Sequence, residues 1–400
     1  MTRYNFDKIT NRKGTNCLKY DFAVERGKPA DVLPLWVADM DFPVSEEITK
    51  SLHAAVEHGI YGYSQPKDAY YNAVMNWMER NHNWKTEREW IVKTPGVVFA
   101  LGAAVKAFTD PGDAILIQNP VYYPFTNIIR DNDRRVVDNT LIYEKTAGQS
   151  GDNGYRIDFE DFERKLEQEH IKLFILCNPH NPVGRVWTAE ELQKLGEICL
   201  RHHVIVVSDE IHNDFVYPGY EHTVFATVDP RFAEFTVTCT APSKTFNLAG
   251  LQISNIFIPN EKLRKAFQTE IDKTGYDEPN ALGIVACEAA YRAGEDWLDQ
   301  LRAYLLKNLN FLRNFLQEKI PQIHLVEPEG TYLVWLDCSE LGITGKELDQ
   351  FIVDKAGLWL DGGSMFGPSG AAFQRVNIAC PRATLQLALD KLKTAVDSLK

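Results

Sequence analysis

Ala241-Pro242-Ser243-Lys244-Thr245-Phe246 directly follows the short run Thr236–Thr240, and Ser208-Asp209-Glu210 closes the apolar run Val204–Ser208. Neither run alternates apolar with charged residues, which is typical of strands buried on both faces of a mostly parallel sheet. A lysine and an aspartate therefore come directly after two predicted strands. Ligands bind beyond the carboxyl ends of the strands in such sheets, so we expect both side chains at one site.

The alternation of strands and helices continues through the middle of the chain. Further strands are predicted at Ala114–Gln118, Ile171–Cys177 and Ser254–Pro259, and helices at Val97–Phe108, Ala189–Arg201 and Glu261–Lys273. This alternation predicts an α/β domain in which helices cover a mostly parallel sheet.

The two ends of the chain have a different pattern. Predicted strands at Thr331–Cys338 and Phe373–Cys380, with helices around Trp297–Glu318 and Ala383–Leu399, indicate a smaller α+β unit. The N-terminal residues lack periodicity and are expected to pack over other parts of the chain. The expected division is an N-terminal segment (1–45) packing with the small domain, a large domain (46–285) and a small C-terminal domain (286–400).

The composition is that of an ordinary globular protein. The 400 residues are 44% hydrophobic and 24% charged, and the net charge of −12 argues against a nucleic-acid-binding surface. The seven cysteines are scattered without metal-ligand spacing, which predicts reduced thiols and no bound metal. Neither a signal peptide's apolar core nor a membrane-spanning run of roughly 20 residues is present. We expect a cytoplasmic protein that binds neither nucleic acid nor membrane.

Lys244 and Asp209 together suggest chemistry with pyridoxal 5'-phosphate (PLP). A lysine amine can form a Schiff base with the aldehyde of PLP, and a carboxylate can keep its pyridine nitrogen protonated. The ring then accepts electrons from the substrate Cα. Either residue alone is weak evidence, so the other motifs decide.

Asn178-Pro179-His180-Asn181-Pro182-Val183-Gly184 follows another buried strand. Its two Asn-Pro pairs favour turn or extended backbone. The motif can be an ordinary strand-to-helix loop, or it can aim the Asn181 amide at the ring oxygen of PLP. Because Lys244 and Asp209 are expected at the same site, we favour the interpretation in which Asn181 contacts the ring oxygen of PLP.

A phosphate site is predicted where Gly96 precedes the helix that starts at Val97. Free N–H groups at a helix start suit an anion, so the backbone amides of Val97 and Val98 are candidate donors. Ser243 can add a hydroxyl. A glycine before a helix is common, and the motif is therefore weak without its context.

Three further side chains are candidates for the same site. Tyr122 and Tyr123, between two prolines, can stack on a planar ring or be ordinary half-buried tyrosines. Arg375 lies in a predicted strand and needs a carboxylate partner, from the protein or from a substrate. His212 follows Asp209 by three residues and is a candidate for the edge of the cofactor.

These motifs together resemble the fold type I PLP enzymes of the class I/II aminotransferase superfamily. The resemblance is closest to the MalY/PatB branch, whose members are cystathionine β-lyases and cysteine-S-conjugate β-lyases. It rests on Pro34–Phe42, Asn119–Phe125, Asn178–Trp187, Ser208–His212 and Ala241–Asn247. It implies a large domain with a mostly parallel seven-stranded sheet and a smaller α+β domain.

The resemblance also implies roles toward the cofactor. Lys244 is the Schiff-base lysine and Asp209 the partner of the pyridine nitrogen. Asn181 contacts the ring oxygen, and Tyr122 stacks on the ring. Where many aminotransferases have an arginine for the phosphate and a tyrosine after the aspartate, this chain has Gln252 and His212.

For the substrate, the resemblance implies that Arg375 binds the α-carboxylate near the Ala38 backbone. Tyr63 matches a tyrosine that reaches the phosphate of the neighbouring subunit, which implies a homodimer with shared active sites. The implied reaction is α,β-elimination of sulfur amino acids such as L-cystathionine and L-cysteine. Lys244 would remove the Cα proton, and either Tyr122 or Tyr123 could assist proton transfer. The alternatives are an aminotransferase and a non-catalytic PLP-binding protein.

Overall fold

The computed structural model describes residues 4–145 and 153–399. Its larger sheet has seven strands in the order β2-β10-β9-β8-β7-β3-β4. These strands are β2 (Ile91–Thr94), β3 (Ala114–Ile117), β4 (Arg135–Asp138), β7 (Leu173–Cys177), β8 (Ile205–Asp209), β9 (Thr236–Thr240) and β10 (Ser254–Phe257). Only β10 runs against its neighbours, while the other pairs are parallel. The predicted mostly parallel sheet is confirmed.

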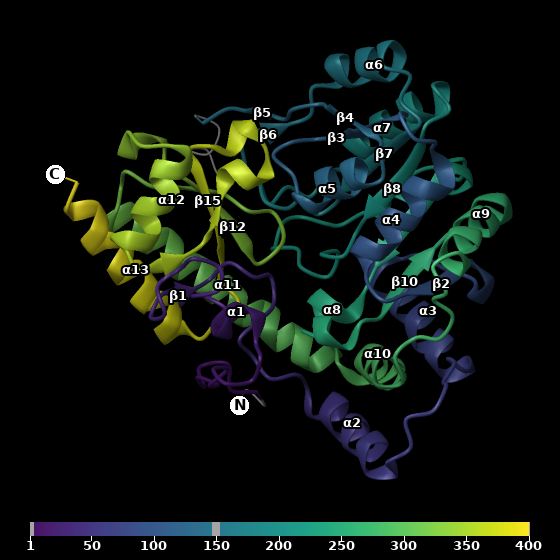
Figure 1. Ribbon diagram of the computed structural model, residues 1–400, viewed down its shortest axis with the longest axis horizontal. Helices are drawn as coiled ribbons and strands as arrows, with labels where there is room; N and C mark the ends of the chain where they lie inside the picture. The colour runs from purple at the N-terminus through teal and green to yellow at the C-terminus, as the bar shows by residue number, and fades with distance from the viewer. Residues whose placement is uncertain (1–3, 146–152, 400) are drawn as a thin grey trace.

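Helices cover both faces of this sheet (Figure 1). The helices are α4 (Val97–Phe108), α5 (Pro124–Asp131), α6 (Phe159–Gln168), α7 (Ala189–Arg201) and α9 (Glu261–Asp272). Phe174 and Leu176 of β7 pack in one apolar cluster with α6 and α7, and Leu173 and Ile175 pack in another with α4, α5 and α9. Successive residues of a strand point to opposite faces, so both faces of β7 are buried. This explains why its sequence is apolar throughout.

A second sheet of four strands, all antiparallel, has the order β11-β12-β15-β14. Its strands are β11 (His324–Val326), β12 (Leu333–Asp337), β14 (Asp361–Gly362) and β15 (Phe373–Asn377), and α11 (Glu295–Lys319), α12 (Gly345–Asp354) and α13 (Arg382–Asp397) lie around it. The short strand β1 (Leu33–Pro34) pairs in parallel with β13 (Leu358–Trp359). The N-terminal segment is therefore joined to this part of the molecule.

Several elements had not been predicted from the sequence. They include α1 (Leu18–Asp21), α2 (Glu46–His58), α3 (Asp68–His82), the hairpin β5 (Ile142–Tyr143) and β6 (Tyr155–Arg156), and α10 (Ala281–Ala293). Helix α2 projects at the lower edge of the molecule and packs on α10 (Figure 1). Of its residues only Ile48 is buried. Among the described helices, none combines the length and the apolar character that crossing a membrane requires.

Gly196 allows α7 to approach the ring of Phe232. A Cβ at Gly196 would lie 2.0 Å from a ring carbon of Phe232, and both residues are buried. We expect Gly196→Ala to lower the free energy of unfolding by about 1–3 kcal/mol, because a packed core must shift to admit the methyl group. Urea unfolding measures the change.

Gly102→Ala is the matched control, since Gly102 lies in α4 and a Cβ there would meet nothing within 4 Å beyond the backbone of its own helix. Alanine is the better helix former, so this variant should be equally or more stable, by roughly 0.5–1 kcal/mol. Equal stability of the two variants would contradict the steric explanation.

Candidate active site

A cavity of about 180 Å³ lies at the carboxyl edge of the large sheet. It is lined by ten of the residues singled out in the sequence: Ala38, Gly96, Val97, Val98, Tyr122, Asn181, Asp209, His212, Ser243 and Lys244. A larger cavity of about 430 Å³ beside α11 and β11 contains none of them. The smaller cavity is therefore the candidate active site.

Lys244 lies on the short helix α8 (Pro242–Thr245), which begins two residues after β9 ends. Its Nζ donates a hydrogen bond to the Ala38 carbonyl at 3.0 Å. Burial lowers the pKa of Lys244 to about 8, assisted by Arg375 and opposed by the charges of Asp39 and Asp209. Near neutral pH part of the population is a neutral amine, which is the form that acts as nucleophile or base.

Asp209 ends β8, and its register partner on the adjacent strand β9 is Cys239, five residues before Lys244. Its carboxylate accepts a hydrogen bond from the backbone N–H of Ile211 at 3.2 Å. Burial raises the pKa of Asp209 to about 7, because it outweighs this bond and the charge of Lys244. A cationic ligand atom beside the carboxylate would reverse this shift.

His212 and Asn181 also line the cavity. Ring nitrogen Nδ1 of His212 is buried without a hydrogen-bond partner among the described residues, and burial lowers the pKa of His212 well below its usual value. Asn181 is 4% exposed and its Oδ1 accepts a hydrogen bond from Arg375 at 3.0 Å. A neutral imidazole with an unused nitrogen and a fixed amide can both bind a polar ligand.

The start of α4 supplies the backbone N–H groups of Val97 and Val98 to the cavity, and its cap, Gly96, has no capping side chain. Ser243 lies in the same cavity. Ser254, at the start of β10, was not predicted: its hydroxyl is buried there without a partner among the described residues. These donors fit an anion such as a phosphate.

Arg375, on β15, is 3% exposed and points its guanidinium at several acceptors. Nη2 pairs with the Asp361 carboxylate and donates to the Trp36 carbonyl at 2.8 Å, and Nη1 donates to Asn181. Nε has no partner among the described residues. The sequence left open whether a protein or a substrate carboxylate pairs with Arg375; Asp361 is a protein partner, and free N–H capacity remains.

Tyr122, Tyr123 and Tyr63 lie in different places. Tyr122 lines the cavity, and burial raises its pKa, so its hydroxyl stays protonated. The Tyr123 ring lies outside the cavity lining, against Phe366 at 6.0 Å between centroids. Tyr63 is 95% exposed, in the segment after α2, and does not reach this cavity within one chain.

A buried polar network begins beside Asp209. The next residue, Glu210, is fully buried and accepts a hydrogen bond from His222 Nε2 at 3.0 Å, in the tautomer that carries the proton there. The ring of His222 packs edge-on against His82, with 5.6 Å between centroids. His222 and His82 are distant from Asp209 in sequence, so no local pattern indicated that they join Glu210 in this network.

The network continues to the residue beside Lys244. His82 Nε2 lies 3.0 Å from Oδ1 of Asp214, and Trp77 Nε1 donates to the same oxygen at 3.1 Å. Thr245, next to Lys244, donates to the other oxygen at 2.6 Å. Burial alone would raise the pKa of Asp214, but these bonds and the His82 and Arg302 charges outweigh it and hold the pKa below its usual value.

Asp214→Asn should therefore lower the free energy of unfolding by about 3 kcal/mol at pH 7. A carboxylate with a depressed pKa stabilises the folded protein above the ordinary value of about 3.9, and that stabilisation is lost as pH falls through the folded pKa. The difference between variant and wild type should thus shrink at pH 3. Urea unfolding at both pH values measures it.

Asp299→Asn is the control, because Asp299 is 64% exposed and pairs with the same Arg302 at 3.2 Å. It should leave stability close to wild type at both pH values. A difference for Asp214→Asn that is equal at pH 7 and pH 3 would refute the ionised state of this carboxylate.

The cavity fits a ligand with an aldehyde, a basic ring nitrogen and a phosphate. The Lys244 amine suits the aldehyde, the Asp209 carboxylate suits a protonated nitrogen, and the free N–H groups of α4 suit the phosphate. PLP has all three groups. The fold and the site together define the class of fold type I PLP enzymes.

Comparison with known proteins gives the family. The model of the family "Aminotransferase class I and II" matches residues 30–392. The chain belongs to this family.

Individual relatives show which members of the family this chain is similar to. Cystathionine beta-lyase PatB of Bacillus subtilis (strain 168) is 46% identical over 392 residues, which cover 98% of this chain and 100% of PatB. Protein MalY of Escherichia coli (strain K12) is 31% identical over 399 residues, covering 99% of this chain and 100% of MalY. The crystal structure of cystalysin from Treponema denticola, which contains PLP, has a TM-score of 0.94 at 38% identity and covers 99% and 100% of the two chains. The predicted MalY/PatB resemblance is confirmed.

Proposed function

We propose that the protein is a PLP-dependent carbon–sulfur β-lyase. Its reaction converts L-cystathionine and one water to homocysteine, pyruvate and ammonia, and L-cysteine and related S-conjugates are further substrates. The observation that carries the proposal is the cavity shared by the Lys244 amine and the Asp209 carboxylate, in a chain similar over its whole length to a cystathionine β-lyase.

In this proposal the residues around the cavity hold the cofactor. Lys244 would bind its aldehyde, Asp209 its protonated ring nitrogen and Asn181 its ring oxygen, with His212 at the edge. The N–H groups of Val97 and Val98 and the Ser243 hydroxyl, beside Gly96, would hold its phosphate. When bound, PLP supplies a ring that accepts the electron pair left at the substrate Cα after proton loss.

Lys244 moves the proton in this mechanism. With a pKa of about 8 its amine is partly neutral near pH 7, so Nζ can take the proton from Cα once the substrate has displaced it. Asp209 would stay ionised beside a protonated ring nitrogen, because attraction to that cation offsets the burial that raises its pKa. The Asp209 carboxylate would in turn hold the proton on the ring nitrogen. After Lys244 takes the Cα proton, the leaving group at Cβ would depart as a thiolate.

Arg375 and Tyr122 orient the substrate. The N–H groups of Arg375 left over by Asp361 bind the α-carboxylate, next to the Ala38 backbone. Tyr122 lines the cavity and would stack on the ring, and burial keeps its hydroxyl protonated. We assign the assisting proton transfer to Tyr122 rather than Tyr123, because Tyr122 alone of the two lines the cavity.

The alternative is an aminotransferase, which uses the same lysine, aspartate and arginine. The two reactions differ in where the proton returns and in whether a thiolate leaves. An aminotransferase needs a keto acid to complete its cycle, whereas a β-lyase does not. The relatives of this chain include proteins named cystathionine beta-lyase and proteins named aminotransferase. The reaction products therefore have to distinguish the two activities.

Pyruvate and free thiol should appear in equal amounts when PLP-loaded protein is given L-cystathionine without a keto acid. Lys244→Ala should release neither and should lose the absorption band of the lysine-bound cofactor. Absence of pyruvate, with slow conversion of PLP to its amine form, would establish the aminotransferase instead.

We also propose a homodimer with shared active sites. Val56, Ile60, Tyr61 and Tyr63 are all at least half exposed, at the end of α2 and in the segment after it. Figure 1 shows this part of the chain projecting from the molecule. Such an exposed apolar group is typical of an interface. Tyr63 would reach the phosphate bound by the partner subunit.

Mixing two inactive variants tests the shared sites. Tyr63→Ala and Lys244→Ala each remove one component, but in a mixed dimer one site keeps both residues. Random reassortment should restore about a quarter of the sites, since half the dimers are mixed and each has one complete site. Pyruvate release measures it, with each variant alone as control. No recovery in verified mixed dimers would exclude sharing through Tyr63.

The domain boundaries expected from the sequence, 46–285 and 286–400 with the N-terminal segment on the smaller domain, are part of the proposal. The seven-stranded sheet uses residues between 91 and 257, and the four-stranded sheet uses residues between 324 and 377. The pairing of β1 with β13 supports the placement of the N-terminal segment.

A cytoplasmic location is likewise proposed. All seven cysteines are free thiols, and six are buried. Free thiols are typical of proteins in a reducing compartment.

A further inference from the structure

Residues 36–42, here called the strap, pass the cavity without helix or strand. The Ala38 carbonyl accepts hydrogen bonds from Lys244 Nζ at 3.0 Å and from the Tyr332 hydroxyl at 2.9 Å. The Trp36 carbonyl accepts one from Arg375 at 2.8 Å. The strap therefore touches both the proposed base and the proposed carboxylate-binding residue.

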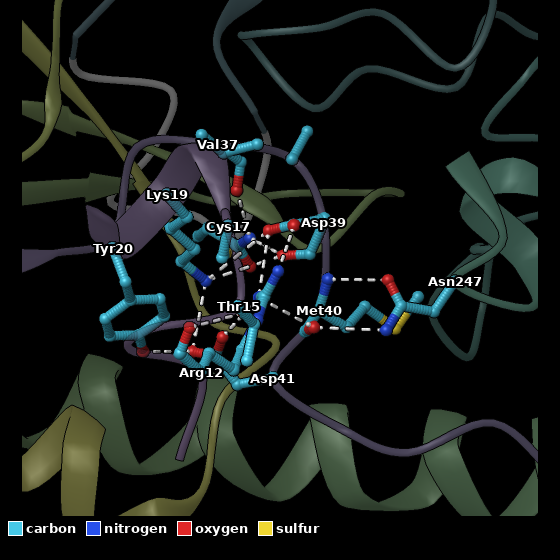
Figure 2. A network of polar contacts seen from close by, with 12 residues as sticks. Arg12, Thr15, Cys17, Lys19, Tyr20, Val37, Asp39, Met40, Asp41 and Asn247 are labelled. Carbon is cyan, nitrogen blue, oxygen red and sulfur yellow. Dashed lines mark hydrogen bonds and ion pairs between the residues drawn. The ribbon is translucent and has the colours of Figure 1, made fainter. Parts of the chain in front are cut away.

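A cluster of four charged side chains, here called the clamp, holds the strap from its other side (Figure 2). Arg12 pairs with Asp39 at 2.5 Å and with Asp41 at 2.7 Å. Lys19 pairs with Asp41 at 3.0 Å and lies 3.9 Å from Asp39. The Tyr20 hydroxyl donates to Asp41 at 3.0 Å. Two cations thus balance two carboxylates of the strap.

Lys19 is 0% exposed, which is unusual for a lysine. A buried cation is costly unless paired, and removing it leaves its partner carboxylates under-compensated. Asp41 is 5% exposed and depends on this pairing. The clamp therefore has one preferred arrangement, in which Asp39 and Asp41 are fixed relative to residues 12–20.

Asn247 connects the strap to residues 244–247, here called the lysine loop, which contain the end of α8. Its side chain accepts a hydrogen bond from the Met40 N–H at 2.9 Å and donates to the Met40 carbonyl at 3.1 Å (Figure 2). It also donates to the Phe42 carbonyl at 3.0 Å. Asn247 is three residues after Lys244. Displacement of the strap would therefore act on the lysine loop directly as well as through Ala38.

We propose that Arg12 and Lys19 are positioning residues of the active site, which clamp the strap so that its Ala38 and Trp36 carbonyls orient Lys244 and Arg375. Neither residue lines the cavity, and both act through Asp39 and Asp41. The proposal rests on the proposed function for the roles of Lys244 and Arg375, but the geometry of the clamp does not depend on which reaction follows.

Cys17 provides a probe of the clamp that needs no catalysis. It lies between Arg12 and Lys19 and is the one described cysteine that is not buried. Lys19→Met keeps the length of the side chain and removes the charge. It should raise the rate at which a thiol reagent labels Cys17 by at least tenfold, because loosening residues 12–20 exposes the thiol. Lys13→Met, at an exposed neighbouring lysine, should leave the rate unchanged.

The effect on substrate binding is the second readout. In PLP-loaded protein Lys19→Met should raise KM for L-cystathionine about tenfold or more, because Arg375 loses its orientation. Arg12→Lys should retain more of the wild-type KM than Arg12→Ala. Tyr20→Phe, which removes one hydrogen bond only, replaces Lys19→Met should that variant fail to fold. We expect it to raise both the Cys17 labelling rate and KM by a smaller factor.

Three results would overturn the proposal. The first is unchanged Cys17 labelling in Lys19→Met. The second is a variant that melts earlier but keeps the wild-type KM, since a purely structural role predicts that combination. The third is equal KM for Arg12→Lys and Arg12→Ala. Failure of the proposed β-lyase reaction would be recognised separately, by wild-type protein that releases no pyruvate while Cys17 labelling still responds to Lys19→Met.

Discussion

Burial of an amine and a carboxylate in one cavity is the constraint on which this structure depends. Removal from water disfavours the charged form of each, so the pKa of Lys244 falls to about 8 and that of Asp209 rises to about 7. Adjacent parallel strands bring them together, because β8 ends at Asp209 opposite Cys239 of β9, and α8 follows within the next few residues. The cavity therefore suits a ligand that carries charges opposite to those of Lys244 and Asp209.

Such an arrangement persists only where the surroundings hold it in place. Two separate sets of hydrogen bonds hold the lysine loop in place. Thr245 donates to buried Asp214, which belongs to the histidine network behind β8, and Asn247 binds the strap. Both sets of hydrogen bonds are made by polar side chains, and satisfied buried polar networks help to specify one arrangement of the chain.

The local patterns of the sequence were sufficient for the central fold and for most of the cavity lining. Helices α4 and α7 have their predicted bounds, because apolar periodicity and the Thr188 cap mark them locally. Helix α2 was missed because it buries little of its surface. Asp361 and Ser254 were missed because their importance comes from contacts with residues distant in sequence, which no local pattern encodes. The sequence could not show which of Tyr122 and Tyr123 lines the cavity, because this depends on how the backbone turns into α5.

The pairing of Arg375 with Asp361 bears on which substrates the cavity accepts. Because Asp361 already neutralises this guanidinium, the remaining N–H groups would bind one carboxylate, in the role proposed for Arg375, by geometry more than by net charge. Among the described residues, Lys244 is the one Lys or Arg side chain that lines the cavity; Arg375 is not part of the lining and contacts it through Asn181. An amino acid with an acidic side chain would bring a second carboxylate without a second cation to receive it, and burying that charge would be costly. A thioether side chain, or one whose distal end is electrically neutral overall, avoids this cost. The charge balance of the site therefore favours sulfur amino acids over dicarboxylic amino acids.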